Sequence, residues 1–235
     1  IWRASLSRCE GNWPLLAHEA ANRAAAQAAM TDFIFPSRAR EIARSVDAAK
    51  HVRLNGAMDH LIEGYRVYRE QRWPELRSLH KVLAERGQAP RTLVIACADS
   101  RVDPATIFNA GPGELFVVRN VANLAPPFEE APGFHGVSAA IEFAVKNLKV
   151  ETVLVLGHAQ CGGVAAALEE RPRDPHSFLD AWISLLDTAK SRIPEGGDRM
   201  SELEHESIRV TLENLATFPF VQDAMKSRGR NLIGM

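Results

Sequence analysis

Residues 92–97 read TLVIAC, a short and uninterrupted apolar run that ends in a cysteine. The turn-forming sequence GQAP at 87–90 precedes the run and separates it from a helical pattern before it. A continuous apolar run of this length, rich in strand-forming residues, is typical of a strand that is buried on both faces of a parallel sheet. The stretch therefore predicts a strand over 92–96 that presents Cys97 at its carboxyl end.

Two more apolar runs follow, LFVV at 115–118 and TVLVL at 152–156, and a helical pattern over 136–148 lies between them. This order predicts an α/β fold with a mainly parallel β-sheet flanked by helices. In such sheets reactive groups gather in the crevice beyond the carboxyl ends of the strands, which is where Cys97 and His158 fall. We expect the two strand ends to converge on one site.

Apolar side chains recur at three- and four-residue intervals over 59–86, which predicts an N-terminal helical arm interrupted near Pro74. Residues 1–29 are interpreted as an N-terminal extension that is not part of the fold. Residues 30–235 are interpreted as a single domain.

The composition is ordinary for a soluble globular protein, with 24% charged and 46% hydrophobic residues and a formal net charge of -1. Such a balance indicates neither a nucleic acid nor a membrane as partner. Three cysteines in 235 residues are too few for a disulfide framework and indicate a reducing compartment. We expect a cytoplasmic protein.

Cys97, His158 and Cys161 form the most informative set of residues. Two sulfurs and an imidazole suit zinc, and catalytic zinc sites use three protein ligands while the fourth position stays open for water. A single cysteine at a strand end is commonly just a small buried hydrophobe. The His-x-x-Cys spacing and the position of both groups at strand ends favour a metal site, whereas Cys9 in the extension is a poor fourth ligand.

Asp99 and Arg101 follow the first cysteine on the same loop. An arginine fork can hold a carboxylate through two hydrogen bonds, which keeps Asp99 ionised and turned toward a metal-bound water. A solvated ion pair on a turn is the alternative. Gly162 and Gly163 open the next helix, whose backbone N–H groups favour a thiolate at Cys161, although tight helix packing explains the two glycines equally well.

Two motifs, CADSRV at 97–102 and GHAQCGG at 157–163, resemble those of the β-class carbonic anhydrases. The resemblance spans about residues 58–224 and includes further family-like stretches at 113–123, 139–145 and 217–221. It implies a β-carbonic anhydrase-like fold and one Zn²⁺ per chain, held by Cys97, His158 and Cys161. It also implies reversible hydration of carbon dioxide to bicarbonate and a proton by a zinc-bound hydroxide.

The resemblance assigns roles to further residues. Asp99, fixed by Arg101, would accept a hydrogen bond from the nucleophile. Substrate binding is assigned to Gln88, Phe116, Val121, Phe143 and Gly162, with the two phenylalanines and Val121 forming an apolar wall. The family pocket lies at a dimer interface embraced by the N-terminal helices, which implies a homodimer or a higher homo-oligomer.

Two positions distinguish subgroups of the family. Some members carry a tryptophan and a glycine, three residues and one residue before the first zinc cysteine, which serve a regulatory bicarbonate site. This sequence has Val94 and Ala96 there and so resembles the plant-type, open-site subgroup.

The last residues depart from the family pattern. Family members continue past the stretch 217–221 into a final strand with a Leu-His-Gly-aromatic pattern, whereas this sequence reads GRNLIGM over 229–235. We therefore expect the family's last strand to be lacking, with one sheet edge left uncovered.

Three other functions stay open at this point. The chain could be a non-catalytic zinc-binding relative, although Asp99 and Arg101 are residues that a structural zinc does not need. It could be a carbon disulfide-type hydrolase on the same scaffold. The loop 157–163 could instead be a glycine-rich anion cradle beside a redox thiol, but it has neither the dinucleotide fingerprint nor the lysine of a phosphate-binding loop.

Overall fold

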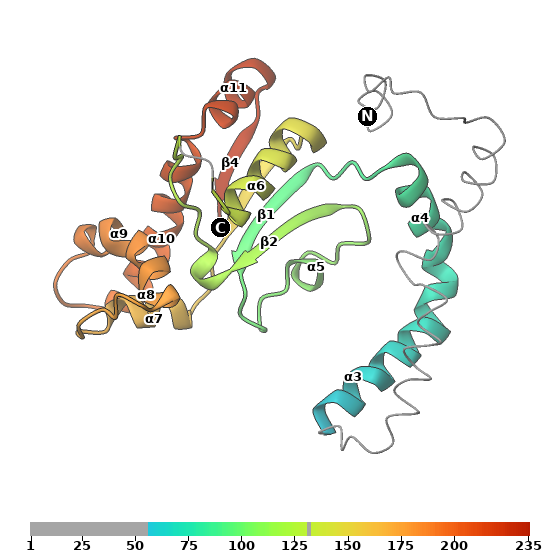
Figure 1. Cartoon of the computed structure of the whole chain (residues 1–235), viewed down its shortest axis with the longest axis horizontal. Coiled ribbons are helices and arrows are strands. Elements are labelled where there is room, and N and C mark those ends of the chain that lie inside the picture. Colours follow the sequence, from blue (N-terminus) through green and yellow to red (C-terminus); the bar gives the residue numbers. More distant parts are fainter. Residues whose placement is uncertain (1–55, 131–132) are drawn as a thin grey trace, which may run out of the picture. The chain divides into compact units, whose positions relative to one another are not determined.

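A sheet of four parallel strands, in the order β2-β1-β3-β4, forms the centre of the protein in the computed structural model, which describes residues 56–130 and 133–235. The strands are β1 (Thr92–Cys97), β2 (Leu115–Asn120), β3 (Thr152–Leu156) and β4 (Asn231–Gly234). Figure 1 shows β1 in the interior of the sheet, flanked by helices. The predicted parallel α/β fold is confirmed.

The chain divides into two compact units, and the boundary lies between Gly87 and Gln88. The described part of the first contains α3 (Gly56–Val67), the π-helix η1 (Tyr68–Arg72) and α4 (Trp73–Arg86). The second contains the sheet with α5 (Pro104–Ile107), η2 (Val121–Asn123), α6 (Gly136–Glu142), η3 (Phe143–Leu148), α7 (Gly162–Leu168), α8 (Phe178–Ile183), η4 (Ser184–Leu186), α9 (Asp187–Arg192), α10 (Arg199–Leu215) and α11 (Pro219–Arg228). The expected boundary near residue 30 lies outside the described residues.

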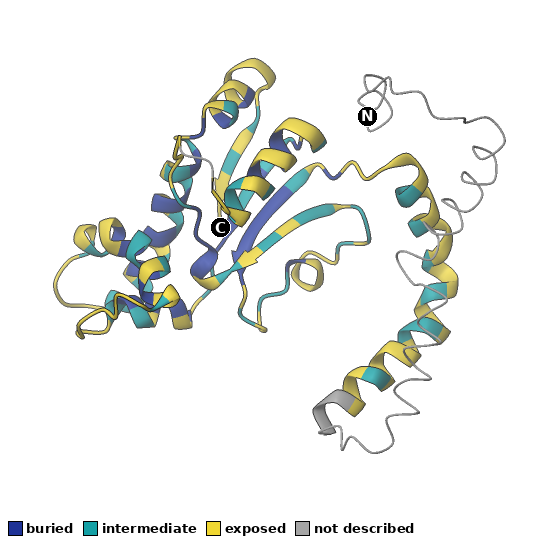
Figure 2. Cartoon of the chain, viewed as in Figure 1, coloured by how far each residue is buried: buried dark blue, intermediate teal, exposed yellow. Residues whose placement is uncertain are grey.

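Strand β1 is the most deeply buried strand, as Figure 2 shows. Successive side chains of a strand point to opposite faces of the sheet. Leu93 and Ile95 therefore join one core cluster with Ile141 and Leu215, from α6 and α10, while Val94 and Ala96 pack on the other face. Burial on both faces explains why the sequence of β1 is continuously apolar rather than alternating.

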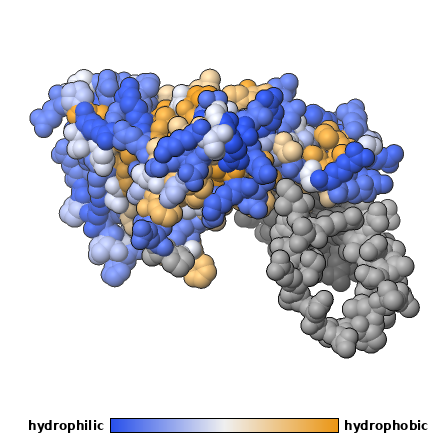
Figure 3. Space-filling view, turned by 90° about the horizontal axis from the view of Figure 1, so that it is seen from above, coloured by the Kyte–Doolittle hydropathy of each residue, from blue (hydrophilic) through white to orange (hydrophobic). Residues whose placement is uncertain are grey.

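The helical arm has its irregularity earlier than predicted. The sequence places the interruption near Pro74, but the π-helix η1 occupies 68–72 and the proline lies in the first turn of α4. Proline lacks a backbone N–H and is tolerated in a first turn, because an N–H there has no intrahelical acceptor and no hydrogen bond is lost. Leu61, Leu79 and Val82 on this arm are exposed, and Figure 3 shows hydrophobic side chains open to solvent on one face of the molecule.

The chain forms one more strand than expected. Asn231–Gly234 pairs in parallel with Thr152–Val155, and Met235 continues the pairing because its N–H donates to the carbonyl of Val155. The carbonyl of Met235 then accepts the N–H of Gly157 at 2.8 Å. The expectation that one sheet edge is uncovered is therefore wrong at β3, because β4 pairs along it. The hydrogen bond to Met235 also holds the backbone of Gly157, the residue before His158.

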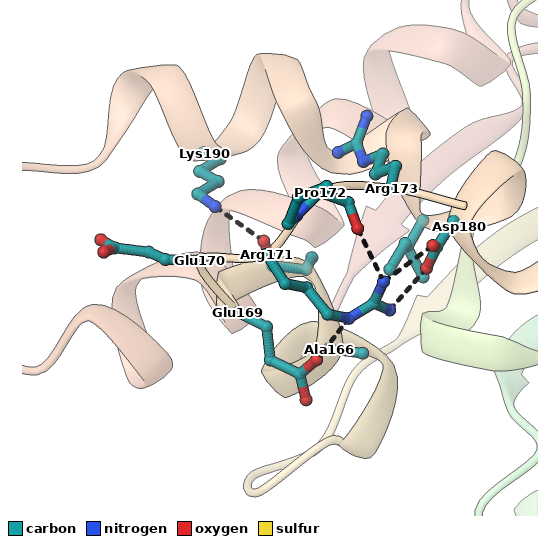
Figure 4. A pocket seen from close by; sticks show the side chains of 10 residues that line it. Ala166, Glu169, Glu170, Arg171, Pro172, Arg173, Asp180 and Lys190 are labelled. Atoms are coloured by element: carbon teal, nitrogen blue, oxygen red, sulfur yellow. Dashed lines mark hydrogen bonds and ion pairs between the residues drawn. The ribbon is translucent and has the colours of Figure 1, made fainter. Parts of the chain in front are cut away.

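The loop after α7 is held by an ion pair beside a cavity of about 390 Å³ (Figure 4). The guanidinium of Arg171 donates two hydrogen bonds, of 2.8 and 2.7 Å, to the buried carboxylate of Asp180, which also accepts the N–H of Asp174. These contacts, the Arg171 bonds foremost, lower the pKa of Asp180 to about 2. Lys190 on the cavity wall donates to the carbonyl of Ala167 and Arg173 pairs with Asp187, so all three cations that line the cavity already have partners.

We predict that Gly234→Ala destabilises the sheet edge. An added Cβ would collide with the Ile208 side chain and would lie 3.0 Å from Leu212 Cδ1, so the unfolding free energy should fall by about 1–3 kcal/mol. Urea unfolding measures this change. Gly136→Ala is the matched control because its Cβ meets nothing within 4 Å. Equal stability of the two variants would contradict the close packing of β4 on α10.

We predict that Asp180→Asn removes a pH-dependent part of the stability. The pKa of Asp180 is about 2 in the folded protein, below its ordinary value of 3.8, so its contribution is fully present above about pH 4. This contribution is lost as the pH falls through 2. The variant should unfold at lower urea concentration than the wild type at neutral pH, and the gap should narrow on acidification. A gap that does not change with pH would contradict the ionised pair.

Candidate active site

Three separate segments bring the predicted metal ligands together at the carboxyl edge of the sheet. Cys97 is the last residue of β1, His158 follows β3 by two residues, and Cys161 directly precedes α7. Strands β1 and β3 are neighbours in the sheet, and the chain leaves them toward opposite sides, which makes this edge a topological switch point. The sulfur atoms and an imidazole nitrogen all lie within 4.8 Å of one another.

The geometry of this Cys-His-Cys group fits a tetrahedral metal ion. The two sulfurs are 3.9 Å apart, and a zinc ion with bonds of about 2.3 Å to both would separate them by about 3.8 Å. His158 Nδ1 lies 2.9 Å from the carbonyl oxygen of Ala159, which can only accept, so this nitrogen carries the proton. His158 Nε2 is then a free lone pair, and it is buried without a hydrogen-bond partner among the described residues.

The two thiols strongly affect one another's ionisation. The contact with the Cys161 thiol is the main cause that lowers the pKa of Cys97, and the N–H of Asp99 contributes in the same direction. The same contact raises the pKa of Cys161, because a second thiolate beside the first is repelled. A cation bound between the sulfurs would relieve this repulsion, so the donor set suits a metal that binds thiolates.

Asp99 and Arg101 form a bidentate pair beside this group. Arg101 donates from Nε to Oδ1 at 2.9 Å and from Nη2 to Oδ2 at 2.8 Å, and its backbone N–H also donates to Oδ1. These bonds hold the pKa of Asp99 far below its usual range. Arg101 Nη2 also donates to the carbonyl of Gln160 at 2.8 Å, so one guanidinium joins the loop after β1 to the loop after β3.

Arg119 was not identified from the sequence, yet it fixes the loop that carries Asp99. This residue pairs with Ala96 in the register of β1 and β2. Its side chain donates to the carbonyl of Cys97 at 2.9 Å and to that of Asp99 at 2.6 Å. The backbone on both sides of Ala98 is therefore tied to the neighbouring strand.

The start of α7 packs closely against the end of β2. A Cβ on Gly163 would lie 2.6 Å from Val121 Cγ1 and 3.0 Å from Ala122 Cβ, so only glycine fits there. Ala122 has a left-handed backbone with φ of 63°, and its N–H faces the sulfur of Cys97. Of the two interpretations of the glycine pair, close packing is thus shown for Gly163, and N–H groups also face both sulfurs.

The predicted substrate residues are only partly gathered at this site within one chain. Val121 and Gly162 lie at the metal group, next to Gly163 and Cys161 respectively. Phe116 and Phe143 contact each other, with ring centroids 5.8 Å apart. On β2, the residue opposite Cys97 is Asn120. Phe116 precedes Asn120 by four residues, which places it about 13 Å along the strand from the level of Cys97.

Gln88 is exposed and lies before the amino end of β1, the end of this strand away from Cys97. The structure of one chain therefore holds the metal group and the Asp99–Arg101 pair in one place. The assignment of all five residues to substrate binding, Val121 and Gly162 included, stays a prediction.

The family profile described as carbonic anhydrase matches residues 92–235. Among curated relatives, Beta carbonic anhydrase 3 of Arabidopsis thaliana is 35% identical over 176 residues, which cover 71% of this chain and 67% of the relative. The chain therefore belongs to the β-carbonic anhydrase family, as the two motifs predict.

Solved structures of β-carbonic anhydrases have the same fold. CcaA matches with a TM-score of 0.63 and 34% identity over 77% of this chain and 82% of its own. A tetrameric enzyme from Sordaria macrospora matches with a TM-score of 0.65 and 28% identity over 77% and 91%. A Coccomyxa enzyme, solved in complex with acetazolamide, matches with a TM-score of 0.63 and 30% identity. The match covers 74% of this chain and 78% of the Coccomyxa chain. The predictions of fold and enzyme class are confirmed: this chain is a carbonic anhydrase.

Proposed function

We propose that the protein catalyses the reversible hydration of carbon dioxide to bicarbonate and a proton, with one Zn²⁺ held by Cys97, His158 and Cys161. One observation carries this proposal. The ligand atoms of the Cys-His-Cys group lie within 4.8 Å of one another, beside the Asp99 carboxylate that Arg101 holds through two side-chain hydrogen bonds. When bound, zinc supplies the Lewis acidity that makes a hydroxide nucleophile available near neutral pH.

Asp99 has one acceptor position left for the reacting oxygen. A carboxylate offers about four lone-pair directions, and Arg101 uses two on Oδ1 and one on Oδ2. The remaining lone pair on Oδ2 can accept the O–H of the nucleophile. Because Asp99 stays ionised far below neutral pH, it cannot donate there, so it selects the orientation in which the oxygen lone pair faces the carbon.

Arg101 acts through Asp99 and is a positioning residue. Its fork fixes the carboxylate plane, and its bond to Gln160 fixes that plane relative to the loop that carries His158 and Cys161. The pairing of both Asp99 oxygens with Arg101 supports the open-site, plant-type arrangement, in which the carboxylate does not occupy a metal position.

We propose that the working form is a homodimer or a higher homo-oligomer. Gln88, Phe116 and Phe143 do not reach the metal group within one chain, which supports a pocket completed by a second copy. The apolar side chains of Leu61, Leu79 and Val82 on the arm are exposed in the single chain and would be covered by such a partner. The neighbour from Sordaria macrospora is tetrameric.

We propose separately that the protein is located in the cytoplasm, and this proposal rests on the cysteine content alone. No helix among the described residues is long and apolar enough to cross a membrane.

No specific observation favours the alternative functions. A phosphate cradle would need free N–H groups at the start of α7, but Cys161 N–H donates to Glu204, and the N–H groups of Gly163 and Val164 face the Cys161 sulfur. A purely structural zinc would leave the bidentate Asp99–Arg101 pair without a purpose at the metal.

We predict that Cys161→Ser abolishes zinc binding and carbon dioxide hydration together, because serine does not supply the thiolate ligand. Zinc content and hydration rate at about pH 8.5 measure this, and the wild type should hold about one zinc per chain. Cys9→Ser is the matched control and should retain both properties. Zinc without activity in the wild type would favour a non-catalytic relative, and absence of zinc would exclude the proposal.

We predict that Arg101→Lys lowers kcat/KM about 100-fold while zinc content is unchanged, because an ammonium cannot hold Asp99 through two bonds. Stopped-flow hydration measures the rate. The control is Arg91→Lys, which alters an exposed arginine–carboxylate pair with Glu151 outside the site. Equal activity of the two variants would contradict the positioning role.

A further inference from the structure

Glu204 reaches the metal group from a distant part of the sequence. It lies on α10, and its Oε1 accepts the backbone N–H of Cys161, 43 residues earlier, at 3.0 Å. No lysine or arginine of the described segments lies within ion-pair distance of this carboxylate, although Glu206 and Glu213 on the same helix each pair with Arg192. Glu204 therefore directs a half-buried negative charge at the backbone of a metal ligand.

The N–H groups at the start of α7 have divided roles. Those of Gly163 and Val164 face the sulfur of Cys161, where they stabilise a thiolate. The N–H of Cys161 itself points the other way, to Glu204. Because Cys161 is 1% exposed, water cannot easily replace this acceptor.

The direction of the Cys161 sulfur depends on this anchor. Cys161 has an extended backbone, with φ of -73° and ψ of 119°, and the chain becomes helical at Gly162. The two glycines that follow lack side chains, and a Cβ on Gly162 would meet nothing within 4 Å, so packing at that residue does not fix the turn. The close packing of Gly163 on the end of β2 and a charge-assisted hydrogen bond from Cys161 to helix α10 fix it together.

We propose that Glu204 is a positioning residue that sets the start of α7 and thereby holds the Cys161 thiolate in place for the metal. The inference rests on the proposed zinc site and deepens it. Groups that orient metal ligands through hydrogen bonds typically change metal affinity by about 10–100-fold when they are removed.

The experiment compares zinc affinity and the Co²⁺ spectrum in the full-length protein and four variants. Glu204→Ala removes the acceptor, Glu204→Gln keeps a side-chain oxygen of the same reach, and Glu204→Asp keeps the charge but is one methylene shorter. Glu202→Ala is the control, since Glu202 is exposed on the same helix. Competition with a chromophoric chelator gives the zinc dissociation constant, and the thiolate-to-cobalt charge-transfer band reports the geometry of the sulfur ligands.

We expect Glu204→Ala and Glu204→Asp to weaken zinc binding about 10–100-fold and to shift the cobalt band. Glu204→Gln should restore both to near the wild-type values, and Glu202→Ala should match the wild type. If Glu204→Ala does not fold, the contrast between the aspartate and glutamine variants decides the matter. A merely structural role would lower thermal stability without moving the cobalt band.

The inference is overturned if the alanine and aspartate variants bind zinc as tightly as the wild type, or if the glutamine variant loses as much affinity as they do. Failure of the proposed function has a different signature, since it shows as absence of zinc or of hydration activity in the wild type itself. A wild type that binds no zinc would overturn both proposals.

Discussion

Two buried sulfur atoms lie 3.9 Å apart at the edge of the sheet, and the rest of the site is arranged around this pair. Two thiolates at that separation repel each other by about 4 kcal/mol at an effective dielectric constant near 20. Backbone N–H groups of Asp99 and Ala122 face one sulfur, and those of Gly163 and Val164 face the other. These dipoles reduce the repulsion, and a divalent cation would reverse it.

The order of the strands makes this concentration of charge possible. Strand β1 is paired on both sides, so Cys97 lies at the end of the most deeply buried strand of the sheet. The register that pairs Ala96 with both Arg119 and Leu156 brings the loop after β1 level with the loop that carries His158. Arg119 and Arg101 then tie these loops by hydrogen bonds to backbone carbonyls. The sheet thus places the two loops beside each other, and the two arginines fix how these loops are oriented.

The metal ligands and the three main strands could be predicted because each has a local signal: a continuous apolar run, a turn, or the His-x-x-Cys spacing. Strand β4 could not, since its four residues include a glycine and its pairing with β3 depends on contacts with Ile208 that are distant in sequence. The contribution of Glu204 was missed for the same reason, because nothing near Cys161 indicates which helix will accept its N–H. Local chemistry is thus readable, but the partners that orient it are fixed by tertiary structure.

The reaction needs a bound metal with its acceptor and an apolar enclosure for carbon dioxide, and a single chain provides only the residues for the first. Among residues 56–130 and 133–235, the hydrogen bonds that orient the metal group and the Asp99 acceptor all come from the second unit. The predicted apolar wall does not have this property, because Phe116 packs against Phe143 and the core rather than against the ligands. Metal binding should therefore be a property of each chain, whereas the enclosure of carbon dioxide would depend on assembly in the oligomer that we propose. Dissociation would then impair catalysis before it releases the metal.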